Sequence, residues 1–399
     1  MGQLKRMMDE RFERGGWRSL GKTICPNCLS DTALKTLAEE SLDQDRCDYC
    51  DREGNAVACD TDVVMERIGD GLAEDFTDPN EVLYFGEDGG WEGDTFDTHD
   101  VIAKIEETIG VDDFVTDVIG AYGGKEWCDA EPYVTPRHES LLYSWDKFAE
   151  VVKYESRYLF LRRGGDDYPD PHDVGPGEML EALGAVVEEA TVIRELDADS
   201  VIFRARPGSP GEFAENAAEL GTAPRQKAYS NRMSPPGIAL FYGASDEETA
   251  MREVWAGPEP GREQVTVGRF TNSSSLRVLD LAELREVPSR FDDDRHLRTA
   301  LRFLHVFSER VSGAVRTAPR SVQEFVEYVP TQIVSEYFRT IYASEEGTLD
   351  GILYRSVERG GGVCCALFVP RERCADRATF AGGDKTLIFM DATSRTALP

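Results

Sequence analysis

The pattern of apolar positions changes character about halfway along this chain of 399 residues. In the first half, apolar residues recur every three or four positions, which predicts amphipathic helices. These helices begin near residues 62, 98, 136 and 178, and the last two extend to about 158 and 190. Between those two, residues 162–177 are dense in Gly, Pro and Asp, which predicts a linker.

After residue 191 the apolar residues fall into short runs rich in β-branched and aromatic side chains, which predict strands. The runs cover residues 191–196, 200–206, 237–243, 263–270, 276–281, 350–356, 362–369 and 386–390. Helical spacing interrupts them over residues 246–255, 295–311 and 331–341. Ser245 and Glu248 have the spacing of a capping box at the start of the first of these helices. The chain is therefore predicted to be α+β, with a mainly helical N-terminal part and a mixed α/β C-terminal part.

Two C-x-x-C pairs stand near the N-terminus, Cys25 with Cys28 and Cys47 with Cys50, and 18 residues separate them. Each pair places two thiolates on one tight turn, so two pairs complete the tetrahedral sulfur shell that Zn²⁺ prefers. We therefore predict a structural zinc site, whose metal stabilises a small N-terminal segment. A redox-active pair and free thiols stay open as alternatives.

The chain is strongly acidic, with a formal net charge of −31, and most of its 44 basic residues are arginines. Such a surface repels phosphate backbones and anionic lipid headgroups, so we expect no direct binding to nucleic acid or to membranes. No apolar run approaches the ~20 residues of a membrane-spanning helix. The first residues also lack an apolar signal core, and we expect a cytoplasmic protein.

Two common nucleotide-binding motifs are absent from the sequence. No GxGxxG follows a predicted strand, and no GxxxxGK[ST] occurs, which argues against a Rossmann site and a P-loop. The glycines at 360–362 are more typical of a hairpin turn than of a phosphate-binding loop.

Four segments in the second half resemble, in the expected order, the motifs of the RES family. They are residues 203–206 (FRAR), 231–244 (NRMSPPG followed by LFYGA), 249–254 (TAMREV) and 350–356 (DGILYRS), with 328–332 (YVPTQ) as a further element. The N-terminal part, with its C-x-x-C pairs and helices, resembles the HEPN/RES N-terminal domain that is often fused ahead of RES. HEPN ribonucleases carry Arg-x₄-His, and none of the five histidines has an arginine five positions earlier, so we expect no ribonuclease activity.

The resemblance implies a fold related to ADP-ribosyltransferases, found in toxins that degrade NAD⁺ or in some cases transfer ADP-ribose to a protein. Such toxins are usually paired with a separately encoded Xre-type antitoxin. We therefore expect an NAD⁺ glycohydrolase or phosphorylase in a toxin–antitoxin or defence context. The alternatives are a protein ADP-ribosyltransferase and, in another class, a non-catalytic zinc-dependent regulatory module. A restraining partner protein and a homo-oligomer stay open.

On this basis we expect three segments. Residues 1–161 form a zinc ribbon plus a helical domain of the HEPN/RES N-terminal type. Residues 162–195 form a linker and a bridging helix, and residues 196–399 form the RES domain. Because a free toxin would harm its host, we expect the N-terminal domain to restrain the RES half or to sense a trigger.

Cleavage of the nicotinamide–ribose bond passes through an oxocarbenium-like transition state, which a carboxylate beside the ribose stabilises. The resemblance assigns that role to Glu253 and places Ser356 beside it, where the hydroxyl could bind a ribose hydroxyl or the nicotinamide amide. Arg355 stands where the family more usually has a small residue or proline. Gln332 is a supporting candidate.

Three arginines and two tyrosines are predicted to bind NAD⁺. Arg204 is the first choice for the pyrophosphate, because a guanidinium group offers planar, bidentate donors. Arg206 lies two residues further on the same face of the strand, and Arg232 is a second phosphate candidate. Tyr242, at the end of a predicted strand, is the expected aromatic platform for the nicotinamide ring, with Tyr229 as its rival.

Overall fold

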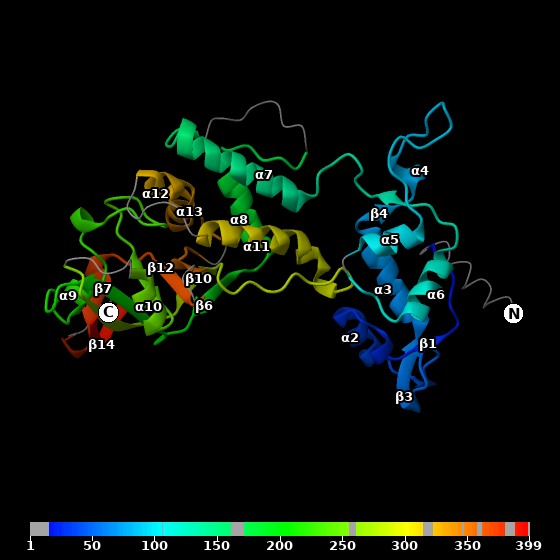
Figure 1. The fold of residues 1–399 in the computed structure, drawn as a ribbon, viewed down its shortest axis with the longest axis horizontal. Coiled ribbons are helices and arrows are strands. Elements are labelled where there is room, and N and C mark those ends of the chain that lie inside the picture. The colour runs from blue at the N-terminus through cyan, green and yellow to red at the C-terminus, as the bar shows by residue number, and fades with distance from the viewer. Residues whose placement is uncertain are drawn as a thin grey trace. The chain divides into compact units, whose positions relative to one another are not determined.

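The computed structural model describes residues 16–105, 107–160, 171–254, 261–313, 322–344, 347–356, 361–379 and 388–397. These residues form two compact units. The first contains the described residues up to Thr135 together with Glu286–Thr299. The second contains Pro136–Arg285 and the described residues from Ala300 onward. Figure 1 traces both units.

The first unit is mainly helical, with two small sheets. Its elements are β1 (Thr23–Ile24), η1 (Pro26–Cys28), α2 (Thr32–Glu40), β2 (Gln44–Arg46), β3 (Glu53–Asp60), α3 (Thr61–Ala73), β4 (Phe76–Thr77), α4 (Pro79–Val82), α5 (Thr98–Lys104), α6 (Asp112–Tyr122), β5 (Cys128–Asp129) and η5 (Asp293–Leu297). The strand order is β1-β3-β2 in one sheet, and β4 pairs with β5 in the other. Aspartates supply the N-caps of α2, α3, α4 and α5, each accepting a backbone N–H through its side chain.

The segment 286–299 completes the core of the first unit, although it follows the rest of that unit by some 150 residues in the chain. Phe291 is fully buried in the same apolar cluster as Ile68 and Leu72 of α3. Gly71 allows this approach, because a Cβ atom there would lie 2.7 Å from Cδ1 of Phe291. The space that a larger side chain at position 71 would occupy is thus filled by Phe291 of the inserted segment.

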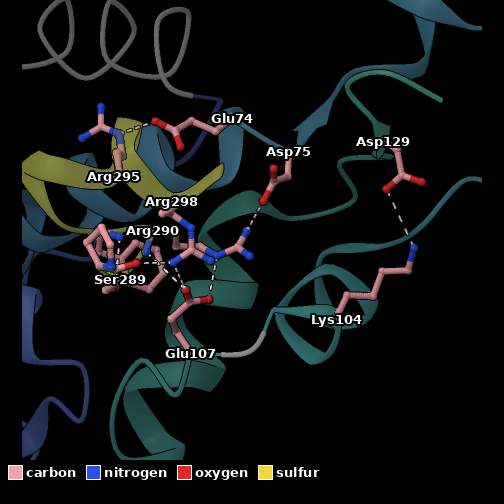
Figure 2. A network of polar contacts seen from close by, with 11 residues as sticks. Glu74, Asp75, Lys104, Glu107, Asp129, Ser289, Arg290, Arg295 and Arg298 are labelled. Carbon is pink, nitrogen blue, oxygen red and sulfur yellow. Dashed lines mark hydrogen bonds and ion pairs between the residues drawn. The ribbon is translucent and has the colours of Figure 1, made fainter. Parts of the chain in front are cut away.

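Polar contacts hold the same segment, as Figure 2 shows. Arg290 is buried and donates from Nε to the Glu107 carboxylate at 2.8 Å and from Nη1 to Asp75 at 2.9 Å. Arg298 adds a second cation to Glu107 at 2.7 Å. Burial raises the pKa of Glu107, but the two arginines outweigh it and leave that pKa below its usual value.

The second unit combines helices with one large sheet. Its elements are α7 (Arg137–Glu150), the π-helical turn η2 (Val151–Glu155), α8 (Met179–Glu189), β6 (Ile193–Leu196), β7 (Val201–Gly208), α9 (Ala217–Leu220), η4 (Arg225–Lys227), β8 (Phe241–Ala244), α10 (Glu247–Val254), β9 (Gln264–Asn272), β10 (Leu276–Asp280), α11 (Arg298–Ser312, whose first two residues belong to the first unit), α12 (Val322–Glu327), α13 (Val329–Thr340), β11 (Gly351–Arg355), β12 (Val363–Leu367), η6 (Arg371–Arg373), β13 (Cys374–Asp376), η7 (Arg377–Thr379) and β14 (Ile388–Ala397).

The described strands of this unit form a nine-stranded mixed sheet in the order β13-β14-β9-β7-β8-β12-β11-β10-β6. The β10–β11 and β13–β14 pairs are parallel and the other pairs are antiparallel. One face carries a continuous apolar cluster, to which Ile202, Phe241, Phe270 and Leu353 belong. Figure 1 shows α8, α11, α12 and α13 gathered at one side of β10 and β12.

The structure confirms a mixed α/β chain with a large mixed sheet, and several local details differ from expectation. The helix expected over 136–158 is a regular α-helix only as far as Glu150 and ends in the π-helical turn. It belongs to the second unit. Asp246, not Ser245, caps α10, accepting from the Thr249 N–H at 2.8 Å. Part of the expected linker, residues 162–170, lies outside the described residues. So does residue 360 of the expected glycine turn.

None of the helices that the structure describes has the length and apolar character needed to cross a bilayer.

Candidate active site and candidate metal centre

The four cysteines of the two C-x-x-C pairs come together in the first unit. Their sulfur atoms all lie within 4.8 Å of one another. Three of the separations are 3.7 Å (Cys25–Cys28), 3.6 Å (Cys25–Cys50) and 3.8 Å (Cys28–Cys47). A tetrahedral zinc ion with Zn–S distances of about 2.3 Å places its sulfurs about 3.8 Å apart. The sulfur geometry therefore fits a zinc ion.

The surroundings of the cluster support the same reading. The backbone N–H groups of Cys25 and Tyr49 donate to Cys47 Sγ at 3.2 and 3.4 Å, which suits a sulfur that carries negative charge. Burial raises the pKa of the Cys28 thiol, and the neighbouring cysteines raise it further. Four thiolates this close repel one another unless a cation neutralises them. The cluster can hold a metal such as zinc, joining η1 to the turn after β2.

In the second unit, α10 places Glu253 beside the ends of two strands. The helix begins under the Asp246 cap and packs against β7, β8, β9 and β12. It packs tightly at Gly362, just before β12, where a Cβ atom would lie 2.0 Å from Thr249 Oγ1. Because Glu253 lies one helical turn beyond Thr249, it is brought to the same strand ends.

Ser356 and Cys364 hold the carboxylate of Glu253. The Ser356 hydroxyl donates to Glu253 Oε1, and the Ser356 backbone N–H bonds the Gly362 carbonyl at 2.8 Å. Cys364 is 1% exposed, and its thiol also forms a hydrogen bond with Glu253. Burial and the nearby Glu253 raise the pKa of this thiol, so it stays a donor at neutral pH. An exposed carboxylate is thus oriented by two buried groups.

Two tyrosines lie on the same face of the sheet as Cys364, which contacts this carboxylate. Tyr354 pairs with Cys364 across β11 and β12, and Tyr242 pairs with Ala366 across β8 and β12. Strand alternation therefore places Tyr242, Tyr354 and Cys364 on one face of the sheet. The Tyr242 hydroxyl bonds the Ser234 hydroxyl at 2.9 Å. Burial raises the pKa of Tyr242 and raises that of Tyr354 well above its usual value, so both rings stay neutral.

Arg232 and Tyr328 contact each other within electrostatic reach of Tyr242 and Glu253. The Arg232 guanidinium carbon is 5.3 Å from the centre of the Tyr328 ring. Arg232 donates from Nη1 to the carbonyls of Val311 at 3.0 Å and Gly313 at 2.7 Å, and no described carboxylate pairs with it. Burial, the hydrogen bond to Glu324 and the nearby Glu253 raise the pKa of Tyr328 to about 12. Tyr328 therefore lies within electrostatic reach of both the arginine and the carboxylate.

Gln332 fastens the loop that carries Arg232. Its buried amide donates to Ser230 Oγ at 3.0 Å, to the Asn231 carbonyl at 2.8 Å and to the Ser234 carbonyl at 3.3 Å. The neighbouring Thr331 hydroxyl donates to the Arg232 carbonyl at 2.5 Å. The YVPTQ segment thus supplies both an aromatic ring and the anchor of the NRMSPPG loop.

Arg204 and Arg206 lie elsewhere. The register of β7 with β8 and β9 puts them on the opposite face of the sheet from Tyr242 and Cys364. Arg204 donates to the Tyr242 backbone carbonyl at 2.7 Å, and its buried Nε has no partner among the described residues. Burial, and then the nearby Arg206, lower the pKa of Arg204 to about 10. Arg206 donates to the Gly221 carbonyl at 3.1 Å.

The structure thus brings together Glu253, Ser356, Tyr242 and Arg232 from the sequence-derived set, and sets Arg204 and Arg206 apart from them. Tyr229 is 81% exposed and makes no ring contact with the described residues of this group. Sequence reasoning did not assign Cys364, Tyr354 or Tyr328 to the site. Strand alternation gives a signal for the first two, since Tyr354 lies two residues before Ser356 on the same face.

Comparison with protein families adds to this geometry. A family model described as RES domain matches residues 202–389, and one described as HEPN/RES N-terminal domain 1 matches residues 40–166. This chain is a RES-domain protein with a HEPN/RES N-terminal domain. No curated protein and no solved structure matches the chain. RES domains are associated with NAD-related toxin activity.

Two structural features of this RES-domain protein do not follow the boundaries of the matched ranges. The segment Glu286–Thr299 falls within the residues matched as RES, yet it belongs to the first compact unit. The HEPN/RES match starts at residue 40, so Cys47 and Cys50 lie inside it and Cys25 and Cys28 lie before it.

Proposed function

We propose that this RES-domain protein is an NAD⁺-consuming enzyme that cleaves the nicotinamide–ribose bond, as a glycohydrolase or a phosphorylase. The observation that carries the proposal is the Glu253 carboxylate, which accepts hydrogen bonds from the Ser356 hydroxyl and the Cys364 thiol. Two neutral tyrosines, Tyr242 and Tyr354, lie on the same face of the sheet as Cys364. A carboxylate oriented by buried donors and left open to solvent suits a reaction that develops positive charge on a sugar.

The proposed chemistry follows from that arrangement. The bond from the nicotinamide nitrogen to the ribose carbon breaks, and its electron pair neutralises the positively charged ring nitrogen. Positive charge then develops on the ribose carbon and ring oxygen, where the Glu253 carboxylate stabilises it. Water or phosphate adds to that carbon, and in the hydrolytic case Glu253 orients the water and accepts its proton.

Arg232 and Tyr328 are the groups proposed to bind the substrate. Arg232 has no described carboxylate partner, and its guanidinium is already fixed by two carbonyls, so it can receive the pyrophosphate with little loss of freedom. Tyr328 or Tyr242 provides the aromatic surface for the nicotinamide ring. Arg204 stays a sequence-based candidate for the same phosphates.

One incubation tests the proposed function. Purified protein is mixed with NAD⁺, with and without phosphate and cell lysate, and nicotinamide, ADP-ribose, ADP-ribose 1″-phosphate and labelled protein are followed. Free ADP-ribose indicates hydrolysis, the 1″-phosphate indicates phosphorolysis, and labelled protein indicates ADP-ribose transfer. Glu253→Gln is the matched control. If the wild-type protein is as inert as this variant under every condition, the non-catalytic regulatory module replaces the proposal.

We further propose that the four-cysteine cluster holds structural zinc and that the enzyme acts in a toxin–antitoxin or defence context. The sulfur separations near 3.7 Å support the metal. An NAD⁺-consuming activity requires restraint in its host, which an Xre-type antitoxin or the N-terminal domain would supply. Expression in cells with and without a co-expressed Xre-type antitoxin candidate, with growth as the readout, tests the context.

A further inference from the structure

A cavity of 490 Å³ opens in the second unit, and Arg355, the residue before Ser356, lines it. Its walls are the loop that follows β10, the C-terminal turns of α11 and the side chain of Arg355 at the end of β11. Its volume is that of a typical site for a small ligand, about 300–1,000 Å³. The cavity is therefore large enough for part of a dinucleotide.

Two of the wall residues lie next to groups of the site, one along the chain and one through a hydrogen bond. Arg355 immediately precedes Ser356, so their Cα atoms are about 3.8 Å apart, while its pairing with Val363 turns its side chain to the other face of the sheet from Cys364. Gly313, on the opposite wall, accepts the hydrogen bond from Arg232 at 2.7 Å. Arg232 thus contacts both the cavity wall at Gly313 and Tyr328, which is within electrostatic reach of the Glu253 carboxylate. This order matches a dinucleotide, which has a ribose at each end and a pyrophosphate between them.

The cavity walls carry charges that no described residue neutralises. Arg355 donates from Nε to the Ala282 carbonyl at 2.8 Å and from Nη1 to the Gly361 carbonyl at 3.3 Å, and its Nη2 has no partner among the residues that the structure describes. Glu309 makes no hydrogen bond or ion pair with the described residues and is exposed. The cavity thus offers one cationic donor, Arg355, and one carboxylate acceptor, Glu309.

This set of groups suits a ribose phosphate. A guanidinium group binds phosphate oxygens, and a carboxylate accepts hydrogen bonds from the two hydroxyls of a ribose. We infer that the cavity holds the adenosine side of the dinucleotide, with Arg355 near its phosphate and Glu309 accepting from its ribose hydroxyls. This inference rests on the proposed function and adds a specificity to it. A phosphate on the 2′-hydroxyl would face the Glu309 carboxylate, so the enzyme prefers NAD⁺ to NADP⁺.

Calorimetric binding to the full-length protein tests the cavity without turnover. AMP and adenosine 2′,5′-bisphosphate are titrated into wild-type protein, Glu309→Gln, Arg355→Ala and the control Glu336→Gln, which removes the same charge from α13. We expect the wild-type protein to favour AMP. Glu309→Gln should reduce that preference by about tenfold, and Arg355→Ala should weaken both ligands. Failure of AMP to bind, or an equal preference in Glu309→Gln and Glu336→Gln, overturns the inference.

Turnover separates this inference from the proposed function. The kcat/KM values for NAD⁺ and NADP⁺ are compared in wild type, Glu309→Gln and Glu336→Gln. A protein that consumes neither dinucleotide but still binds AMP through Arg355 contradicts the proposed reaction and supports the cavity. A protein that consumes both with a ratio unaffected by Glu309→Gln supports the reaction and contradicts the assignment of the cavity.

Discussion

Two arginines of the second unit differ in burial and in contacts, and we propose different roles for them. Arg204 is directed away from the face that carries Tyr242 and Cys364, and burial lowers its pKa to about 10. A lowered pKa in a cation means that the folded protein disfavours its charge. Arg232 is half-buried, is anchored by carbonyls and lies over Tyr328. Tyr328 is in turn within electrostatic reach of the Glu253 carboxylate.

Replacement of each arginine by methionine distinguishes their roles. In Arg204→Met, relief of the desolvated charge opposes the loss of a hydrogen bond to the Tyr242 carbonyl, so the free energy of unfolding should change by only about 1 kcal/mol. Its kcat/KM for NAD⁺ should stay near that of the wild type. Arg232→Met should raise KM at least about tenfold. Steady-state kinetics and thermal unfolding measure both, and a well-folded Arg204→Met protein with a much higher KM would instead identify Arg204 as a phosphate ligand.

Cys364 is expected to position Glu253 rather than to react. Its buried thiol donates to the carboxylate, and its raised pKa keeps it protonated above pH 9. Cys364→Ala removes that donor and should lower kcat while leaving KM nearly unchanged. Cys364→Ser restores a donor and should recover most of kcat. Equal loss in both variants would show that the thiol acts by packing alone, and rapid inactivation by iodoacetamide would contradict the protonated state.

At the scale of elements, periodic apolar positions predicted most helices and strands well. The helix expected near residue 62 is α3, and the runs near 200 and 263 are β7 and β9. These segments are long enough for one face to be buried throughout, so local pattern and tertiary packing agree. Strand order, by contrast, depends on contacts between residues that are far apart in the chain, and no local pattern encodes it.

The candidate site divides in the same way. Motif residues such as Glu253 and Ser356 could be identified from the sequence, and the structure places them in contact. Cys364 carries no motif, and it reaches Glu253 only because β12 pairs with β11 at Tyr354. Arg204 lies in a family-like segment, but its direction depends on the register of β7, which the sequence does not specify.

The two C-x-x-C turns are short elements whose folding should depend on metal. η1 has three residues and β1 has two, so hydrogen bonds alone stabilise them weakly. Removing zinc with a chelator, or replacing Cys28 by Ser, should lower the thermal midpoint of the first unit. Metal analysis should find about one zinc per chain in the wild type. Cys59→Ser is the control, since Cys59 donates to the Ile24 carbonyl and is not part of the cluster. A zinc-free wild-type protein with an unchanged midpoint would exclude the metal.

At the scale of the whole molecule, the stability of the first unit should depend on pH through Glu107. Its folded pKa lies below its usual value of about 4.3. The pair with Arg290 and Arg298 therefore contributes its full stability above the unfolded pKa, and that contribution is lost as the pH falls through the folded pKa. Thermal unfolding followed from pH 7 to pH 3 should show this decline.

Glu107→Gln is the matched variant for that measurement. It leaves the buried Arg290 with less compensation, so it should lower the free energy of unfolding at pH 7 by about 3 kcal/mol. It should also flatten the acid dependence, because the titrating group is gone. Glu74→Gln, which disturbs only the more exposed pair with Arg295, should have a much smaller effect. Identical pH profiles in wild type and Glu107→Gln would contradict this role.

The division into units also limits how restraint by the N-terminal domain can be tested. Deleting residues 1–195 would remove α7, α8 and most of β6, which belong to the second unit. A loss of activity in that deletion would therefore report damage to the RES unit. Substitutions confined to the first unit, such as Cys28→Ser, leave the second unit's own residues intact and address restraint directly.

The return of residues 286–299 to the first unit sets an order of events during synthesis. The first unit lacks Arg290 and Phe291 until the ribosome has already made β6 to β10. Glu107 stays without its two arginines until residue 298 has been added. Ser356 is made later still, so Glu253 cannot receive its hydroxyl partner earlier. A growing chain thus holds every part of its N-terminal unit before the proposed NAD⁺-cleaving pair can exist.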